Sequence, residues 1–249
     1  MRIGKAFLMS IGMFSTFPMP KNTWDDECIA LVIPLFPLVG AMIGCAWVGS
    51  AWFLRWTGMP VVLVTALAGL APFFFSGCLH LDGWMDTVDA VFSRRDLDER
   101  RMILKDPHVG AFGVLSVACL FVVHFSALYT VLDANKAFIG LFFLCVLSRA
   151  ATGIALLNNP PISGAGYMAT FQKGKRPAHT IWLVGVVMAT LAITIFIHWK
   201  VTLACTVALL TAFLTEKYLL RQMQGLSGDL CGCILTLIEV CGLLCLAVL

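Results

Sequence analysis

VVLVTALAGLAPFFFSGCL (residues 61–79) leads directly into HLDGWMDTVD (residues 80–89), so that an apolar run ends in three closely spaced carboxylates. The apolar run has the length and composition of a membrane-spanning segment. Acids are scarce in the chain as a whole, with 14 Asp and Glu among 249 residues. A membrane segment therefore delivers the chain to an acidic stretch, and we take this stretch as the first candidate site.

The three carboxylates of this stretch have a helical spacing. Asp82, Asp86 and Asp89 stand at positions i, i+4 and i+7, which at about 100° per residue share an arc of roughly 60° on a helix. Like charges on one stripe repel one another unless a cation lies between them. Carboxylate oxygens suit Mg²⁺, which leaves part of its shell to water or substrate phosphates. The alternative is an N-cap at Asp82 with the other two acids facing water. Beside a membrane segment, where carboxylates are costly, we favour the metal site.

The composition identifies an integral membrane protein. The chain is 60% hydrophobic and 12% charged, with a mean hydropathy of +0.92, which is too apolar for a soluble domain. We expect a single membrane domain over residues 1–249. The net charge of +3 does not indicate nucleic-acid binding. The ten cysteines lie mostly in apolar runs without a CxxC pair, which is typical of small buried residues rather than of zinc or disulfide positions.

We predict an all-α, polytopic bundle of six to seven spans, preceded by a short interfacial or re-entrant helix at residues 3–17. The predicted spans are residues 28–56, 61–79, 110–132, 137–157, 179–199, 201–219 and 231–249. The first of these should be kinked, because it contains Pro34, Pro37 and glycines. A short helix is expected at residues 97–104 and a polar loop at residues 158–177. Thirteen of the 17 Lys and Arg fall in the N-terminal region, 80–109, 158–178 and 217–231. The positive-inside rule puts these loops in the cytoplasm.

Residues on both sides of the acidic stretch are further candidates. Lys105 and Asp106 precede a glycine-containing entry into a span, where the ammonium group would bind phosphate opposite an acid-held metal. The four arginines of residues 94–101 are better explained as a basic surface loop. His80 precedes the stripe, where it could be a base, a ligand or a headgroup contact, although a lone interfacial histidine is more often structural.

Two later regions carry charges that need a partner. Arg149 lies inside a predicted span, where it would pair with a phosphate or with an acid such as Glu239. Asp229 adds a carboxylate at the end of the small-residue loop 225–229, and residues 163–167 form a similar loop. Each loop would either wrap a phosphate or only turn the chain.

Together these motifs resemble the cobalamin synthase family (adenosylcobinamide-GDP ribazoletransferase). The combined block at 80–113 is specific, although any one piece is not. Trp84, Ala90, Pro107 and Ser227 depart from the usual pattern, and none of these departures removes a carboxylate. The matching stretches cover most of the chain and are Phe17-Pro18-Met19-Pro20, Phe36-Pro37-Leu38-Val39-Gly40, His80-Leu81-Asp82-Gly83, Asp86-Thr87, Asp89, Lys105-Asp106, Gly110-Ala111-Phe112-Gly113 and Gly228-Asp229.

The resemblance implies a Mg²⁺-dependent transferase of the bacterial inner (plasma) membrane, acting late in cobamide biosynthesis. It would join adenosylcobinamide-GDP to α-ribazole, or to α-ribazole 5′-phosphate, giving adenosylcobalamin or its 5′-phosphate and releasing GMP. Asp106 and Asp229 would be further metal ligands, or one of them would be the base. The catalytic carboxylates would be Asp82, Asp86, Asp89 and Asp106, of which the first three hold Mg²⁺, and the substrate would be bound by His80, Lys105, Arg149 and Asp229.

Two other classes of membrane protein stay open. The CDP-alcohol phosphotransferases also use clustered aspartates, but their pattern has Ala-Arg soon after the Asp-Gly pair, where this chain has Trp84-Met85. A cation transporter should carry its acids near mid-membrane, and here Glu239 alone is so placed. The sequence leaves open the lower base of the nucleotide and the oligomeric state, a homo-oligomer included.

Overall fold

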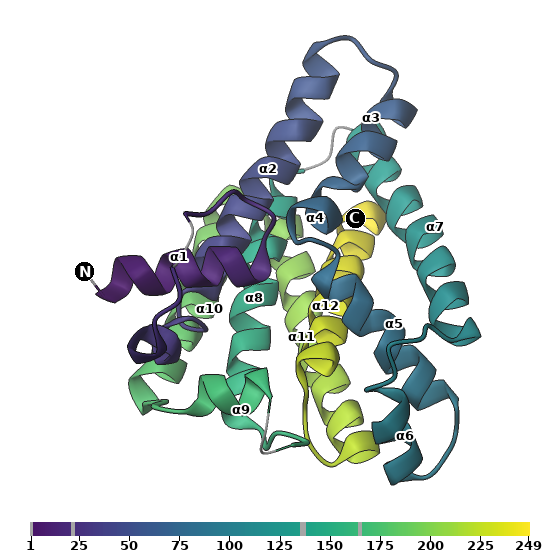
Figure 1. The fold of residues 1–249 in the computed structure, drawn as a ribbon. Coiled ribbons are helices and arrows are strands. Elements are labelled where there is room, and N and C mark those ends of the chain that lie inside the picture. The colour runs from purple at the N-terminus through teal and green to yellow at the C-terminus, as the bar shows by residue number, and fades with distance from the viewer. Residues whose placement is uncertain (1, 21–22, 135–137, 164–165) are drawn as a thin grey trace.

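The computed structural model describes residues 2–20, 23–134, 138–163 and 166–249, and every regular element in these ranges is a helix (Figure 1). Ala137, where the fourth predicted span begins, lies outside them, as do Lys21 and Lys136. Within these ranges six helices are long and apolar enough to cross a membrane, which confirms the predicted multi-span bundle. They are α2 (Phe36–Trp56), α7 (Ala111–Asp133), α8 (Gly140–Asn158), α10 (Pro177–Ile197), α11 (Trp199–Met223) and α12 (Gly228–Val248).

The segment predicted as a span at residues 61–79 is broken, and it continues beyond residue 79. The segment forms α3 (Val61–Gly69) and α4 (Ala71–Phe75), and the chain then turns by 85° into α5 (Leu79–Phe92). Gly77 and Cys78 make the turn with left-handed backbone, at φ of 65° and 58°, a conformation that ends a right-handed helix. The acidic stretch therefore opens the second half of a bent helix pair, whose two halves together have the length and composition of a seventh, broken span.

Two smaller boundaries also differ from the prediction. Residues 28–56 are not one helix, because a 3₁₀ helix (Asp26–Leu31) and a turn precede α2. Asp25 caps the 3₁₀ helix by accepting a hydrogen bond from the Glu27 N–H at 3.1 Å, and Pro34, which has no N–H, falls in the turn. The loop predicted at 158–177 contains α9 (Tyr167–Gln172), whereas the short helix expected at 97–104 is present as α6 (Leu97–Ile103).

Helix α1 (Arg2–Phe14) is the predicted short N-terminal helix, and it lies across the bundle rather than along it (Figure 1). It buries one face, including Ala6 and Met9. Ion pairs from Arg2 to Glu27 at 2.9 Å and from Lys5 to Asp25 hold it against the 3₁₀ helix. This arrangement is the one expected of a helix in the membrane interface.

Helices α8 and α12 form the centre of the bundle. In an apolar stretch of 18 residues, 83% of α8 and 72% of α12 is buried inside the protein. Only 22% of the corresponding stretch of α10 is buried. Its exposed side chains are large and apolar, for example Phe196. Such a face is stable when it meets lipid instead of water. Helices α6 and α9 and the turn from α11 to α12 lie together at one end of the bundle (Figure 1).

Candidate functional site

Helices α5 and α12 cross in close contact, and the crossing brings two acidic segments together. A Cβ on Gly83 would stand 2.6 Å from the Asp229 carbonyl oxygen and 2.8 Å from its Cα, so a residue with a side chain at this position would push α12 away. Ser227 caps α12 by accepting a hydrogen bond from the Leu230 N–H at 3.2 Å. Asp229 follows in the first turn, where the helix dipole favours a negative charge.

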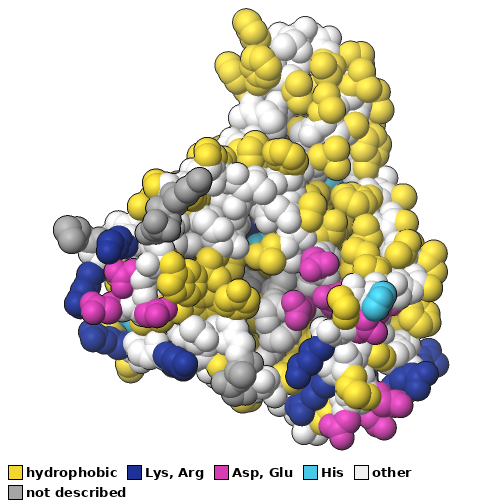
Figure 2. Space-filling model, in the orientation of Figure 1, with side chains coloured by type: hydrophobic (Ala, Val, Ile, Leu, Met, Phe, Trp, Pro, Cys, Tyr) yellow, Lys and Arg dark blue, Asp and Glu magenta, His cyan; other side chains and the backbone are white. Residues whose placement is uncertain are grey.

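The crossing creates a cluster of carboxylates, Asp82, Asp86 and Asp229, that we call the acidic cluster. Asp82 is exposed, whereas Asp86 and Asp229 are partly buried. The negative charge of Asp86 is repelled by those of Asp82, Asp229 and Asp89. Figure 2 shows acidic side chains gathered near this crossing, with Lys and Arg close by. The helical stripe predicted from the spacing is present on α5, and Asp229, from the far end of the chain, adds a further negative charge beside it.

Asp89 belongs to the stripe but is turned toward another helix. Its carboxylate is buried and accepts hydrogen bonds from the Gly110 N–H at 2.8 Å and the Gly113 N–H at 2.9 Å. A Cβ on either glycine would collide with that carboxylate. Asp89 thus satisfies two of the N–H groups at the start of α7, and the two glycines are needed for its close approach.

The carboxylates suit a hard cation, although they are not arranged as a finished metal site. Within the part of the chain that the structure describes, no three His, Cys, Asp or Glu side chains converge on a common metal position. The acidic cluster supplies only carboxylate oxygens, which Mg²⁺ prefers. Its mutual repulsion is the feature that a cation would relieve.

Asp106 and Lys105 are adjacent in sequence but differ in their surroundings. Asp106 accepts hydrogen bonds from the His108 N–H at 2.9 Å and the His108 ring at 2.7 Å. These contacts, the backbone one first, hold the pKa of Asp106 below its usual value. Asp106 lines neither of the two cavities described next, whereas Lys105 lines the smaller one.

The smaller cavity, of about 210 Å³, is the basic cavity. Arg101 and Lys105 line it together with Ser227 and Gly228 at the start of α12. The remaining wall includes Ser163 and Gly166, so both small-residue loops singled out in the sequence reach the same cavity, although Gly164 and Ala165 lie outside the described residues. Cations and a helix N-terminus together make a place for phosphate.

Helix α6, which leads to Lys105, is anchored by two of its own arginines, which the sequence had assigned to a surface loop. Arg101 donates to the Met223 carbonyl at 2.6 Å, and Arg100 donates to the Gln222 carbonyl at 3.3 Å. These carbonyls belong to the last turn of α11, where acceptors lack helical partners. The arginines therefore hold α6 against α11, which fixes the basic side of the cavity.

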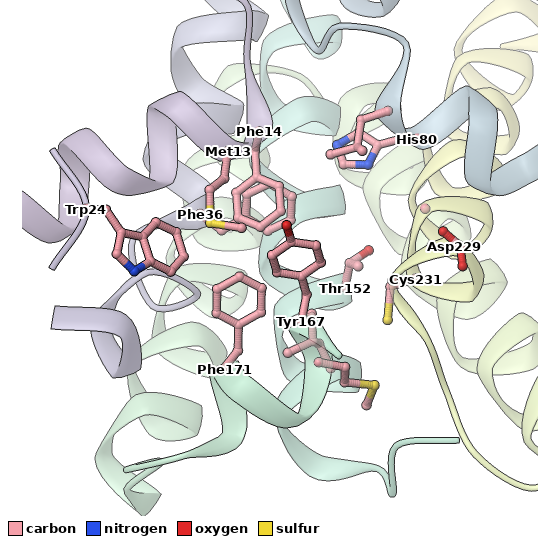
Figure 3. Close-up of a pocket in the computed structure, with 15 residues that line it drawn as sticks. Met13, Phe14, Trp24, Phe36, His80, Thr152, Tyr167, Phe171, Asp229 and Cys231 are labelled. Carbon is pink, nitrogen blue, oxygen red and sulfur yellow. The ribbon is translucent and has the colours of Figure 1, made fainter. Parts of the chain in front are cut away.

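The larger cavity, of about 640 Å³, is the aromatic cavity. It shares Tyr167, Met168, Gly228 and Asp229 with the basic cavity, so the two meet beside the acidic cluster. His80 lines it and is 8% exposed. The sequence did not show that the other wall residues form one site, because they come from a loop and from six helices, namely α1, α2, α5, α8, α9 and α12. They include Phe14, Trp24, Phe36, Thr152, Tyr167 and Phe171 (Figure 3).

Arg149 has the acidic partner that was one of its two predicted alternatives. Its guanidinium is 1% exposed and pairs with Glu239. Glu239 also accepts a hydrogen bond from the Ser148 hydroxyl at 2.9 Å. Arg149 lines neither cavity, and the pair joins α8 to α12 at the centre of the bundle.

The sequence of the chain is similar to those of one family of known proteins. A family model described as cobalamin-5-phosphate synthase matches residues 6–247. A protein from Clostridium perfringens (strain 13 / Type A) is 35% identical over 246 residues, 98% of each chain. One from Clostridium botulinum (strain Alaska E43 / Type E3) is 32% identical, covering 96% of this chain and 95% of its own. One from Geobacillus sp. (strain WCH70) is 31% identical, covering 91% and 88%. All three are named adenosylcobinamide-GDP ribazoletransferase. No solved structure matches this chain.

Proposed function

The chain belongs to the cobalamin-5-phosphate synthase family, and on that premise we propose that it is a Mg²⁺-dependent adenosylcobinamide-GDP ribazoletransferase of late cobalamin biosynthesis. The substrates are adenosylcobinamide-GDP and α-ribazole or its 5′-phosphate, and GMP is released. The observation that carries the proposal is the position of Asp229, which borders both the basic and the aromatic cavity beside the acidic cluster. The family match favours this hypothesis over a CDP-alcohol phosphotransferase or a cation transporter.

The acidic cluster is our proposed Mg²⁺ site. Asp82 and Asp86 from α5 would hold the ion together with Asp229 from α12, because these carboxylates repel one another and supply hard oxygen ligands. Asp89 would fix the start of α7 and reach the ion only through its remaining lone pairs, since each of its oxygens already accepts a backbone N–H. When bound, the ion would neutralise charge on the diphosphate.

The chain's own residues would bind and orient the diphosphate. A hydroxyl of α-ribazole forms a new bond to the phosphorus nearer adenosylcobinamide, the bond from that phosphorus to the bridging oxygen breaks, and the oxygen leaves with GMP. Lys105, Arg101 and the α12 N-terminus, which line the basic cavity, would stabilise the growing charge on that oxygen. An acidic-cluster carboxylate would accept the hydroxyl proton. Asp106 is less suited to this role, because its lowered pKa makes it a weaker base.

We further propose that this end of the bundle faces the cytoplasm. Its loops carry most of the chain's Lys and Arg, and its substrates are charged. Single cysteines introduced at Arg95 and Lys175 should both be labelled by a membrane-impermeant reagent only from the cytoplasmic side. A cysteine at Arg55, in the last turn of α2, should react from the other side. Labelling of the Arg95 and Lys175 positions from opposite faces would contradict the proposed topology.

The direct test is GMP release by the purified protein in lipid nanodiscs, supplied with adenosylcobinamide-GDP and α-ribazole, with Mg²⁺ or with a chelator. Activity should require both substrates and the ion. Lys105→Ala should raise the KM for adenosylcobinamide-GDP by about tenfold, as expected for loss of one charge-assisted contact, and should alter the Mg²⁺ requirement much less.

Lys217→Ala is the matched control for Lys105→Ala. Lys217 is also exposed, but its ammonium lies over the Phe213 ring, 5.5 Å from the centroid, and it lines neither cavity. Its replacement should leave both KM values unchanged. Equal effects of the two substitutions would assign Lys105 to general surface charge rather than to the substrate site.

A further inference from the structure

The aromatic cavity has a polar inner wall opposite its rings. Phe14, Phe36, Tyr167 and Phe171 lie on one side, and His80, Thr152 and Asp229 lie on the other (Figure 3). The rings are already in mutual contact, with the Phe14 and Phe36 centroids 4.4 Å apart and those of Tyr167 and Phe171 6.5 Å apart. Flat aromatic surfaces of this kind favour a flat aromatic ligand.

Two buried polar atoms of the inner wall lack partners. His80 Nε2 and Thr152 Oγ1 have no hydrogen-bond partner among the described residues, and their side chains are 8% and 3% exposed. Leaving a buried donor or acceptor unpaired is costly. Since both residues line the cavity, a ligand with a matching polar atom would satisfy groups that the chain leaves unpaired.

The hydrogen-bonding groups of this wall distinguish between the bases of the two substrates, guanine and the base of ribazole. Guanine presents several donors and acceptors along its edges. With Asp229 assigned to the metal, only His80 and Thr152 are left among the polar groups of the inner wall named above, so most of the guanine groups would be unpaired. The base of ribazole is a neutral, bicyclic aromatic system with one free ring nitrogen as its hydrogen-bond acceptor. A lipid chain would fill the volume but leave both polar atoms unpaired. The volume of about 640 Å³ suits a nucleoside and is too small for a corrin macrocycle.

We propose that the aromatic cavity binds the base of α-ribazole, with His80 Nε2 or the Thr152 hydroxyl donating to the free ring nitrogen. This assignment rests on the proposed function and adds a substrate subsite to it. With the base among the rings, the ribose lies toward Asp229, where the aromatic and basic cavities meet. The attacking hydroxyl is thereby directed at the diphosphate, and the ring nitrogen is shielded from solvent.

The test is direct binding of α-ribazole to the full chain in nanodiscs, measured by equilibrium dialysis without the second substrate. Thr152→Val removes the hydroxyl at nearly constant volume and should raise the Kd by about five- to tenfold, the range for one buried hydrogen bond. The KM for adenosylcobinamide-GDP should not change. Thr65→Val is the matched control, because Thr65 is also buried but donates to the Val61 carbonyl within its own helix. It should leave the Kd unchanged.

A second variant keeps the test decisive if Thr152→Val folds poorly. Trp24 is half exposed at the edge of the cavity, so Trp24→Ala should fold normally and also weaken α-ribazole binding. Equal Kd values for wild type, Thr152→Val and Trp24→Ala would overturn the assignment. Displacement of α-ribazole by GMP would also overturn the assignment in favour of the other substrate. So would a raised KM for adenosylcobinamide-GDP in these two variants if their Kd for α-ribazole is unchanged. Absence of GMP release by the wild type would refute the proposed function, while the Kd series would still decide which ligand the cavity takes.

Discussion

Replacing Asp82 by Asn is expected to lower kcat/KM for GMP release by about 10²- to 10³-fold, the range for loss of one preorganised electrostatic group. The substitution keeps the size of the side chain but removes one of the negative charges that would hold Mg²⁺. It also relieves repulsion with Asp86 and Asp229. The variant should therefore be as stable as the wild type without Mg²⁺, or more stable, because sites arranged for function often sacrifice stability.

Thermal unfolding with and without Mg²⁺ separates these two effects. Mg²⁺ should raise the Tm of the wild type, since an ion that binds only the folded chain stabilises it by mass action, and this increase should be much smaller for Asp82→Asn. Asp98→Asn is the control, because Asp98 is exposed on α6 and lines neither cavity. Near-wild-type turnover of Asp82→Asn at limiting Mg²⁺ would identify the stripe as a solvated face and rule out the metal site.

Replacing Glu239 by Ala should cost about 3–5 kcal/mol of unfolding free energy, the range for breaking a buried ion pair from one side. The loss would leave the Arg149 guanidinium without its acidic partner between α8 and α12 and remove one of the two acceptors of the Ser148 hydroxyl. Unfolding of the purified protein in mixed micelles would measure the change. Glu99→Ala, which breaks the exposed pair with Arg95, should cost less than about 1 kcal/mol.

The double variant Arg149→Met, Glu239→Leu tests what Arg149 does beyond this pair. Replacing both charges with apolar groups removes the unpaired cation and should recover most of the lost stability. If Arg149 serves only the packing of α8 on α12, the double variant should also keep its activity. A stable but inactive double variant would instead support the phosphate contact that the sequence left as the alternative.

Much of the candidate site was predictable from local pattern. The spacing of Asp82, Asp86 and Asp89 predicted one helical stripe, and α5 contains all three. The positions of Lys105 and of the two small-residue loops pointed to a phosphate site, and these residues line one cavity. The placement of the three acids on one helix is confirmed, because helix period acts over a few residues. That the shared cavity takes phosphate stays a prediction.

The prediction failed where backbone conformation and helix crossings decide the result. Hydropathy could not reveal the 85° turn after α4, because an apolar segment has the same hydropathy whether its helices are straight or bent. Nor could spacing reveal that Asp89 turns to α7 while Asp82 and Asp86 stay beside Asp229. Those partners are 21 or more residues away along the chain.

The amino-acid sequence alone was sufficient for the membrane class, the helical content and the acidic stretch, since these follow from composition and from periodicities that each segment carries by itself. The three-dimensional packing was required for the aromatic cavity and its unpaired His80 and Thr152 atoms. It was also required for the approach of Asp229 to Gly83. A cavity wall assembled from separate helices is a property of how those helices pack, and packing is set by long-range contacts that no single segment encodes.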